Sequence, residues 1–390
     1  MKNNYRNRII FCLIGIMIFQ TEFSSAQTDG MNVEHKIVYA EDGKYAGWPA
    51  NHGIWTWGDE ILIGFVQADY NEAGRGLHTY DISTSRNKYA RSLDGGITWK
   101  ITDAFELGQK GLGYDNYGVT DEAIEPIEMK KPIMDFTDSG FILTFLRHNN
   151  NDGPSHFYFS KNKGASWEGG FKFPNMETSG IANRTDYIVD GKQSMSVFIT
   201  TAKSNKKEGR VALARTLDGG LTWDFKSWIT PEHGGFDIMP SSIRLSDTEL
   251  LTTIRTRTED KLDLISSYRS TDNGKSWTRL ADPAPYTGSA GSPPALVKLK
   301  DGRLALGYIY RSENGSRVHV RFSEDNGSTW NDEITLRSGE GANRDVGYPK
   351  ITQRADGKIV MVYYWNHALD VKEKPFRFIA ATIFDPPKAN

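Results

Sequence analysis

Short runs of β-branched and aromatic residues alternate with tight polar turns along most of the chain. The runs include ILIGFV, FILTFL, LALGYIY and IVMVYYW, which have the composition of β-strands. Asp-Gly or a similar pair between two such runs is typical of a β-hairpin, and no long helical period is present. The pattern therefore predicts six hairpins, with turns at Gly58-Asp59, Ser139-Gly140, Asp190-Gly191, Ser246-Asp247, Asp301-Gly302 and Asp356-Gly357.

A second pattern occurs five times and always ends in tryptophan. Its copies are SLDGGITW, SKNKGASW, TLDGGLTW, STDNGKSW and SEDNGSTW, which end at Trp99, Trp167, Trp223, Trp277 and Trp330. From the second copy onward the starts lie 53 to 56 residues apart, which indicates one supersecondary unit repeated around an axis or along a solenoid. Gly permits the turn, Asp and Ser/Thr bond to its backbone, and Trp supplies apolar surface. We assign these copies a structural role.

The pattern S/T-x-D-x-G-x-S/T-W resembles the Asp-box, or BNR repeat, of sialidases and related β-propellers. Six inner hairpins and five boxes then predict an all-β, six-bladed propeller whose last blade lacks a box; seven blades are the alternative. We expect residues 27–390 to form one domain, with an extended loop near Tyr114 to Tyr117. The segment HKIVYA (His35 to Ala40) is expected to close the ring by pairing with the last blade.

Residues 1–26 have the pattern of a signal peptide. Lys2 and Arg8 belong to a basic start, IIFCLIGIMIF is a short apolar stretch, and SSA offers small residues for cleavage. We therefore expect an exported, periplasmic or secreted protein without membrane insertion, because no later stretch is apolar enough to span a bilayer. The single cysteine, Cys12, lies in this segment, so the mature chain would have no disulfide, thiolate metal site or Cys nucleophile.

Charge and motif content narrow the class of partner. The formal net charge is −2, and no basic stripe of the kind that nucleic-acid binding requires is present. The eight His residues show no metal-ligand spacing, and no Gly-rich stretch opens a helix for phosphate. We expect no metal, no cofactor and no nucleic acid, and a monomeric protein.

In a propeller of the sialidase type, the substrate mouth is built by the starts of the innermost strands and by the loops that join second to third strands. Here those positions carry a biased set of cationic and aromatic residues. This set is what a carboxylated or sulfated sugar would require. Its members are Trp48, His78, Lys131, Arg147, His148, Arg184, Met239, Arg255, Arg257, Arg311, Arg317, Arg344, Tyr348 and His367.

The sialidase family uses three arginines around the substrate carboxylate, an Asp acid/base, and a Tyr nucleophile activated by a Glu. The segment DVGYPKITQRADGKIVMVYY resembles the one that carries the nucleophile, which falls on Tyr348. The place of the first arginine reads Gly47-Trp48-Pro49, and the place of the Glu reads Met239-Pro240-Ser241. Arg257 and Arg317 are the candidates for the other two arginines. The scaffold is thus sialidase-like while the catalytic set departs from the family.

The remaining residue types suit elimination from a uronic acid. Cations neutralise the carboxylate, and a Tyr or His removes the C5 proton and protonates the departing oxygen. We expect Tyr348 or His148 to be the base, and the carboxylate to be held by Lys131, Arg184, Arg255 and Arg344. The chain also resembles exported propellers of Bacteroidetes that act on acidic polysaccharides, among them ulvan lyases and an oligosaccharide dehydratase, which implies an acidic oligosaccharide as partner.

Two other readings stay open. That group also contains a rhamnosidase that cleaves next to glucuronate through a histidine, and His52 in Asn51-His52-Gly53 is the residue that would serve such a hydrolase, with a sialidase-like hydrolase as the related case. The other reading is a propeller that binds carbohydrate without turning it over, since propellers host many non-catalytic functions.

Overall fold

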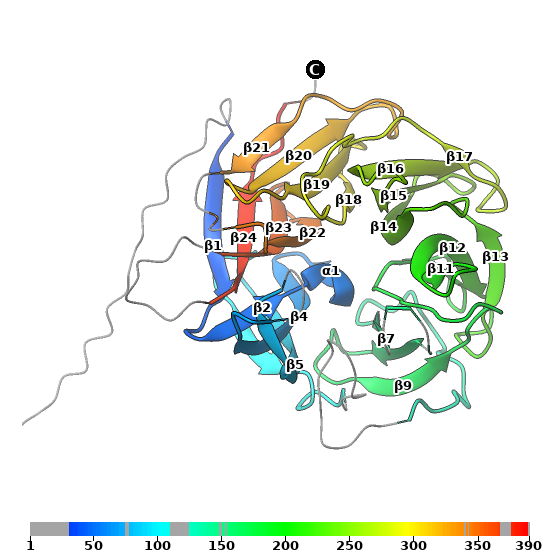
Figure 1. Cartoon of the computed structure of the whole chain (residues 1–390). Coiled ribbons are helices and arrows are strands. Elements are labelled where there is room, and N and C mark those ends of the chain that lie inside the picture. The colour runs from blue at the N-terminus through cyan, green and yellow to red at the C-terminus, as the bar shows by residue number, and fades with distance from the viewer. Residues whose placement is uncertain are drawn as a thin grey trace, which may run out of the picture.

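Six small antiparallel sheets are arranged around a central axis in the computed structural model (Figure 1). The structure describes residues 31–74, 78–109, 125–147, 150–151, 153, 155–338, 341, 343–366 and 376–388. Within these ranges the only helix is the four-residue α1 (Pro49–His52). The all-β, six-bladed propeller is confirmed and the seven-bladed alternative is wrong. The expected signal peptide (residues 1–26) and the expected loop near Tyr114 to Tyr117 lie outside the described residues.

The blades follow one another along the chain. Blade one contains β2 (Lys44–Gly47), β3 (Ile54–Trp57), β4 (Glu60–Tyr70), β5 (Tyr80–Ser92) and β6 (Lys100–Asp103), and blade two contains β7 (Ile142–Arg147), β8 (Ser155–Ser160) and β9 (Glu168–Phe173). Blade three contains β10 (Tyr187–Val189), β11 (Met195–Ala202), β12 (Glu208–Thr216) and β13 (Asp224–Trp228).

The last three blades each have four strands. Blade four contains β14 (Phe236–Arg244), β15 (Leu250–Arg257), β16 (Asp263–Ser270) and β17 (Thr278–Arg279), and blade five contains β18 (Ala295–Lys298), β19 (Leu304–Tyr310), β20 (Arg317–Ser323) and β21 (Ile334–Arg337). Blade six contains β22 (Gly347–Gln353), β23 (Ile359–Trp365), β24 (Phe378–Phe384) and, as its outer strand, β1 (Val33–Tyr39).

The ring closes through the first and last strands of the described chain. β1 pairs antiparallel with β24, with Val33 opposite Phe384, and the two strands lie side by side in Figure 1. The side chains of His35 and Thr382 are hydrogen-bonded at 3.0 Å. The expected closure is therefore confirmed. It also explains why blade six has no Asp-box, because its outer strand comes from the other end of the chain.

Each Asp-box forms the turn between the two outermost strands of its blade. In the fourth copy, Ser270 Oγ accepts a hydrogen bond from the amide of Gly274 at 2.8 Å, and Asp272 Oδ1 accepts one from the amide of Ser276 at 2.9 Å. The hydroxyl of Ser276 and then its amide, which both donate to the Asp272 carboxylate, hold the pKa of Asp272 well below its usual range. The box carboxylates thus accept hydrogen bonds from groups of their own turns, which supports a structural role.

The hydrophobic core lies between neighbouring sheets. One cluster joins Val360 and Val362 of blade six to Leu62 and Phe65 of blade one. Such face-to-face packing lets each small sheet bury apolar surface that it could not cover alone. Nowhere in the described part of the chain does a helix reach the length and apolar character that crossing a membrane requires.

Blade two departs from the expected pattern. The segment EMKKPIMDF, expected as its innermost strand, forms no strand, and Ile127 just before it pairs with Phe171 of the outermost strand β9. The hairpin expected at Ser139-Gly140 is likewise wrong, because no strand precedes β7 there. Side chains from blade three cover the open edge of β7: Tyr187 Oη accepts from the amide of Leu143, and Thr185 Oγ1 from that of Phe145. Buried edge amides are thereby satisfied.

Blade one has an interrupted innermost strand. β2 and β3 pair with opposite ends of β4, and the residues between them form α1. This helix packs against β4, β7 and β22 and lies near the middle of the ring in Figure 1. All four of its residues are buried. The interruption thus brings Trp48 and His52 towards the axis, where the inner strands of the other blades begin.

Candidate functional site

Three residues in or next to inner strands have a strained backbone and precede a proline. Trp48, Met239 and Tyr348 have positive φ angles of 61°, 56° and 54°. The residue before a proline is normally extended, and a left-handed backbone at a non-glycine residue costs on the order of 1–3 kcal/mol. The ladder shifts register beside Met239 and again beside Tyr348. Strain of this kind gathers at functional sites, so the mouth formed by these three blades is the candidate site.

Tyr348 lies between two arginines from other blades. Arg255 Nη1 donates a hydrogen bond to its hydroxyl at 3.3 Å, and the Arg311 guanidinium is 5.4 Å from the centre of its ring. Burial alone would raise the pKa of this hydroxyl, but the charges of Arg255, Arg311 and Arg184 outweigh it and lower that pKa. The mouth therefore contains a tyrosine that ionises more readily than usual.

A histidine held by a buried carboxylate lies next to Tyr348. Nδ1 of His78 is 2.9 Å from Asp345 Oδ1, and the His78 and Tyr348 rings have centroids 6.3 Å apart. The other ring nitrogen of His78, Nε2, makes no hydrogen bond to the described residues, and 22% of this side chain is exposed. A carboxylate that fixes one imidazole nitrogen leaves the other to exchange a proton with a bound molecule.

Asp345 is the hub that fixes this side of the mouth. It is 1% exposed and accepts hydrogen bonds from Tyr364 at 3.0 Å and from Tyr45 at 3.3 Å, besides the contact with His78. Arg377, also buried, lies 3.3 Å from its other oxygen. Burial alone would raise the pKa of Asp345, but the hydrogen bond and charge of His78, followed by Arg377 and Arg311, hold it well below its usual range. Asp345 is therefore an anion that positions its neighbours.

Four further expected residues lie at or near the mouth. Trp48 packs edge-on against His78, with ring centroids 5.1 Å apart. Arg184 pairs with Glu208 and donates to the carbonyl of Ala182. Arg147 is buried and donates to Asn150. His52 is 1% exposed, and burial together with the charge of Arg147 lowers its pKa to about 3, so it is a neutral residue inside α1 at ordinary pH.

Other expected residues lie apart from Tyr348 or are committed to other partners. Arg257 makes a two-pronged ion pair with Asp263, with both contacts at 2.8 Å. Arg344 pairs with Glu313 at 2.6 Å. Lys131 is exposed beside Ile127, Phe159 and Phe171 on the outer side of blade two, so its expected place at the mouth is wrong. His148 and His367 lie outside the described residues.

The arginines that flank the tyrosine are not the pair that the sialidase resemblance suggested, although Arg255 was expected among the cations of the mouth. Arg317 lies against Tyr310, with its guanidinium 5.7 Å from the ring, while Arg257 is paired with Asp263. Arg255 and Arg311 occupy the positions beside Tyr348 instead. The sequence placed Asp345 at the predicted mouth without a role, and it gave no indication of Tyr45, Tyr364 or Arg377. The only signal for Asp345 was its position three residues before Tyr348.

Comparison with known proteins supports the architecture. Residues 192–361 match the model of a family described as a BNR repeat-like domain. No curated protein sequence matches the chain. Among solved structures, a protein of unknown function from Dyadobacter fermentans superposes with a TM-score of 0.67 at 20% identity, covering 92% of this chain and all of that one.

Two enzymes share the fold at lower similarity. The NanB sialidase of Streptococcus pneumoniae gives a TM-score of 0.57 at 15% identity, covering 90% of this chain and 70% of that one. An α-L-arabinofuranosidase of Fusarium graminearum gives 0.50 at 12% identity, covering 88% of this chain and 96% of that one. The chain thus contains BNR repeats in a sialidase-like propeller fold.

Proposed function

We propose that the protein is a carbohydrate-active enzyme that hydrolyses a glycoside of an anionic sugar at the mouth of the propeller. The observation that carries this proposal is the position of Tyr348 between Arg255 and Arg311. A tyrosine that ionises readily is a competent nucleophile, and tyrosine replaces the usual carboxylate nucleophile in some glycosidases. Fold neighbours that are a sialidase and an arabinofuranosidase support a hydrolase over other reaction classes.

The two arginines favour an anionic sugar. Arg311 is 1% exposed and donates to the carbonyl of Val346 and to Tyr364, while its Nη1 has no acceptor among the described residues. Arg255 likewise keeps Nε without an acceptor there. Two buried cations that share one tyrosine are stabilised by a further negative charge, and a carboxylate matches the free N–H groups of guanidinium in shape and charge.

The reaction follows from the positions of Tyr348 and His78. The Tyr348 oxyanion attacks the anomeric carbon, and the bond to the leaving oxygen breaks as that oxygen takes a proton from Nε2 of His78. Water then attacks the glycosyl-tyrosine while His78 takes its proton, which releases the sugar and restores both side chains. The two rings lie side by side at the mouth, with centroids 6.3 Å apart.

Elimination from a uronic acid is the second candidate. It is favoured by the hydrogen-bond partner of the Tyr348 hydroxyl, which is Arg255 rather than a carboxylate in the described structure. Without a carboxylate to activate it further, the phenolate suits removal of a C5 proton whose acidity the arginines raise through the sugar carboxylate. The leaving oxygen would again take its proton from His78, and the product would be an unsaturated uronate.

The test is incubation of the protein with α-sialosides and with uronate-terminated oligosaccharides, with products followed by mass spectrometry and ultraviolet absorbance. Hydrolysis predicts cleavage with the gain of one water and a sugar attached to Tyr348 in quenched protein. An unsaturated product would show that the reaction is elimination and not hydrolysis. If no acidic glycoside is turned over, the propeller binds carbohydrate without catalysis. On the basis of residues 1–26 we also infer that the enzyme is exported, which its cellular fractionation tests.

A further inference from the structure

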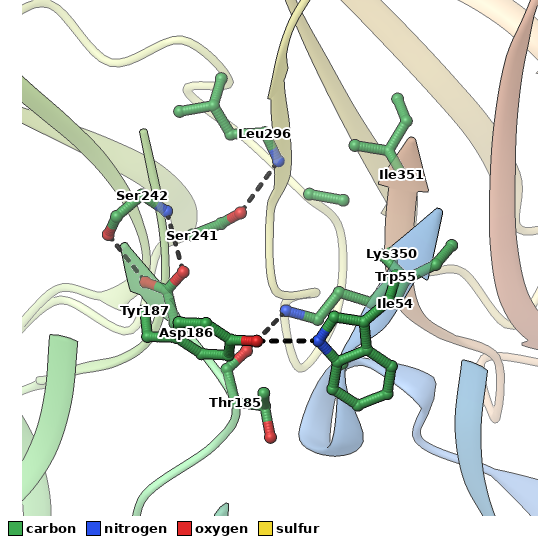
Figure 2. A pocket seen from close by; sticks show the side chains of 12 residues that line it. Ile54, Trp55, Thr185, Asp186, Tyr187, Ser241, Ser242, Leu296, Lys350 and Ile351 are labelled. Carbon is green, nitrogen blue, oxygen red and sulfur yellow. Dashed lines mark hydrogen bonds between the residues drawn. The ribbon is translucent and has the colours of Figure 1, made fainter. Parts of the chain in front are cut away.

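A second hollow lies on the propeller axis. Its volume is about 280 Å³, and residues from five blades line it (Figure 2). The polar and aromatic residues that line this axial cavity include Trp55 of β3, Asp186 next to β10, Tyr187 of β10, Ser242 of β14 and Lys350 of β22.

The axial cavity is separate from the mouth. At the level of the mouth, Ala50 and Met239 are buried and pack in one apolar cluster with Tyr348, and none of these three residues lines the cavity. Lys350 follows Tyr348 by two positions along its strand, and Ser242 follows Met239 by three. The residues that line the cavity therefore lie further along these strands than Tyr348 and Met239 do.

Charged groups of both signs face this cavity. Lys350 Nζ donates to the carbonyl of Thr185 at 3.0 Å, which uses one of its three N–H groups within the described structure. Asp186 accepts from the amide of Ser242 at 3.2 Å and from its hydroxyl at 2.7 Å. Burial raises the pKa of Asp186 to about 6, with Lys350 and then Ser242 opposing that rise. The pair is electrically balanced, and it keeps both donors and acceptors for a ligand.

The aromatic wall is rigid. Trp55 Nε1 donates to Tyr187 Oη at 3.0 Å, and the Trp55 ring packs against Trp167 with centroids 5.9 Å apart. Tyr187 Oη also accepts from the amide of Leu143. Its own hydroxyl proton has no acceptor among the described residues and can be donated to a ligand. A fixed flat ring beside hydrogen-bonding groups of both kinds suits a sugar, which has an apolar C–H face and hydroxyls that donate and accept.

We propose that the axial cavity is a second saccharide-binding site, and that it takes one neutral monosaccharide unit. An anionic sugar is disfavoured here because it would meet the Asp186 carboxylate, whereas Arg255 and Arg311 beside Tyr348 favour an anion at the mouth. Hydroxyl groups of a neutral sugar would accept from Lys350 and donate to Asp186, while the ring lies against Trp55. This site does not depend on the reaction proposed at the mouth.

The probes are D-glucose, D-galactose and L-rhamnose, with D-glucuronate as the anionic counterpart, titrated into the whole protein by calorimetry. At least one neutral sugar should bind wild-type protein. Asp186→Asn and Lys350→Met should each weaken that binding about 10- to 100-fold, since each removes a hydrogen bond to a charged group. Trp55→Phe should weaken it as well, whereas Trp57→Phe, on the same strand but outside the cavity, should not. Thermal unfolding identifies the variants that fold.

Tyr348→Phe separates the two proposals, because it should stop turnover at the mouth and leave neutral-sugar binding unchanged. If no neutral sugar binds, the second site is wrong whatever the mouth does. It is equally wrong if binding persists in all three cavity variants and is lost in Arg255→Gln, since the sugar would then lie in the mouth. Neutral-sugar binding that is lost in the cavity variants, in a protein without turnover of acidic glycosides, would support the cavity and reject the proposed reaction.

Discussion

The hydroxyl of Tyr348 accepts a hydrogen bond from Arg255 Nη1 at 3.3 Å, although the two residues are 93 positions apart in the chain. Arg255 is at the same time held by the carbonyl of Ala290, to which its Nη2 donates at 2.5 Å. The guanidinium is therefore fixed from two blades before a substrate arrives. A charge held in place stabilises a developing phenolate without the cost of reorganisation.

Tyr348→Phe removes the reacting oxygen while keeping the ring between its arginines. We expect kcat to fall by about 10²–10⁴ with little change in KM, because substrate binding by the arginines remains. Steady-state kinetics on the substrate identified above measure both constants. Wild-type turnover in this variant would show that Tyr348 is not the reacting group.

Arg255→Gln removes the first of the charges that lower the pKa of Tyr348. That pKa should rise, so the acidic limb of the pH profile of kcat/KM should move to higher pH, since the ionised tyrosine is the active form. Arg257→Gln is the matched control on the same strand, because its charge is already paired with Asp263. An equal movement of the limb in both variants would contradict a specific effect of Arg255.

Asp345→Asn removes the buried anion next to Arg377 and should lower the free energy of unfolding by about 3–5 kcal/mol at neutral pH. The pKa of Asp345 is lowered in the folded protein, so its stabilisation is present above the unfolded value of about 3.9 and is lost as pH falls below it. The deficit should therefore narrow near about pH 3. Urea unfolding at the two pH values checks this, and an equal deficit at both would argue against it.

Trp223→Ala and Trp277→Ala compare two Asp-boxes that differ in burial. Trp223 is 8% exposed and packs against Phe145, Phe157 and Phe173, whereas Trp277 is only half-buried. The first change should lower the free energy of unfolding by about 3–5 kcal/mol, and the second by less. Thermal and urea unfolding give the order. Substrate preference should stay as in the wild type. A change in substrate preference would contradict the position of the Asp-boxes away from the mouth.

The fold was predictable where the signals were local. Asp-boxes and Asp-Gly turns act through their own backbone, so the short pattern alone predicts them. The structure of EMKKPIMDF could not be predicted in this way, because it depends on long-range contacts. Ile127 pairs with Phe171, and the edge of β7 that this segment was expected to cover is covered by Thr185 and Tyr187. Those contacts join distant segments.

The site was predictable only in part. Tyr348 was found through a resemblance, but Arg255 and Arg257 stand two positions apart on β15 and so share one face of the strand. The choice between them is made by Asp263, which lies opposite Arg257 in the neighbouring strand and pairs with it. The contact of His78 with Asp345 spans 267 positions, which leaves no trace in the local pattern.

The pairing of β1 with β24 sets the order in which the molecule can be completed. His35 and Thr382, which meet across this pair, are 347 positions apart. At about 5–20 residues per second, the ribosome makes the second roughly 17–70 seconds after the first. During that interval the earliest strand has no partner, and the nascent chain is an open arc with an exposed β-edge. In a protein exported as proposed, this edge would have to stay covered until the whole chain has crossed the membrane, because only then can β1 pair with β24.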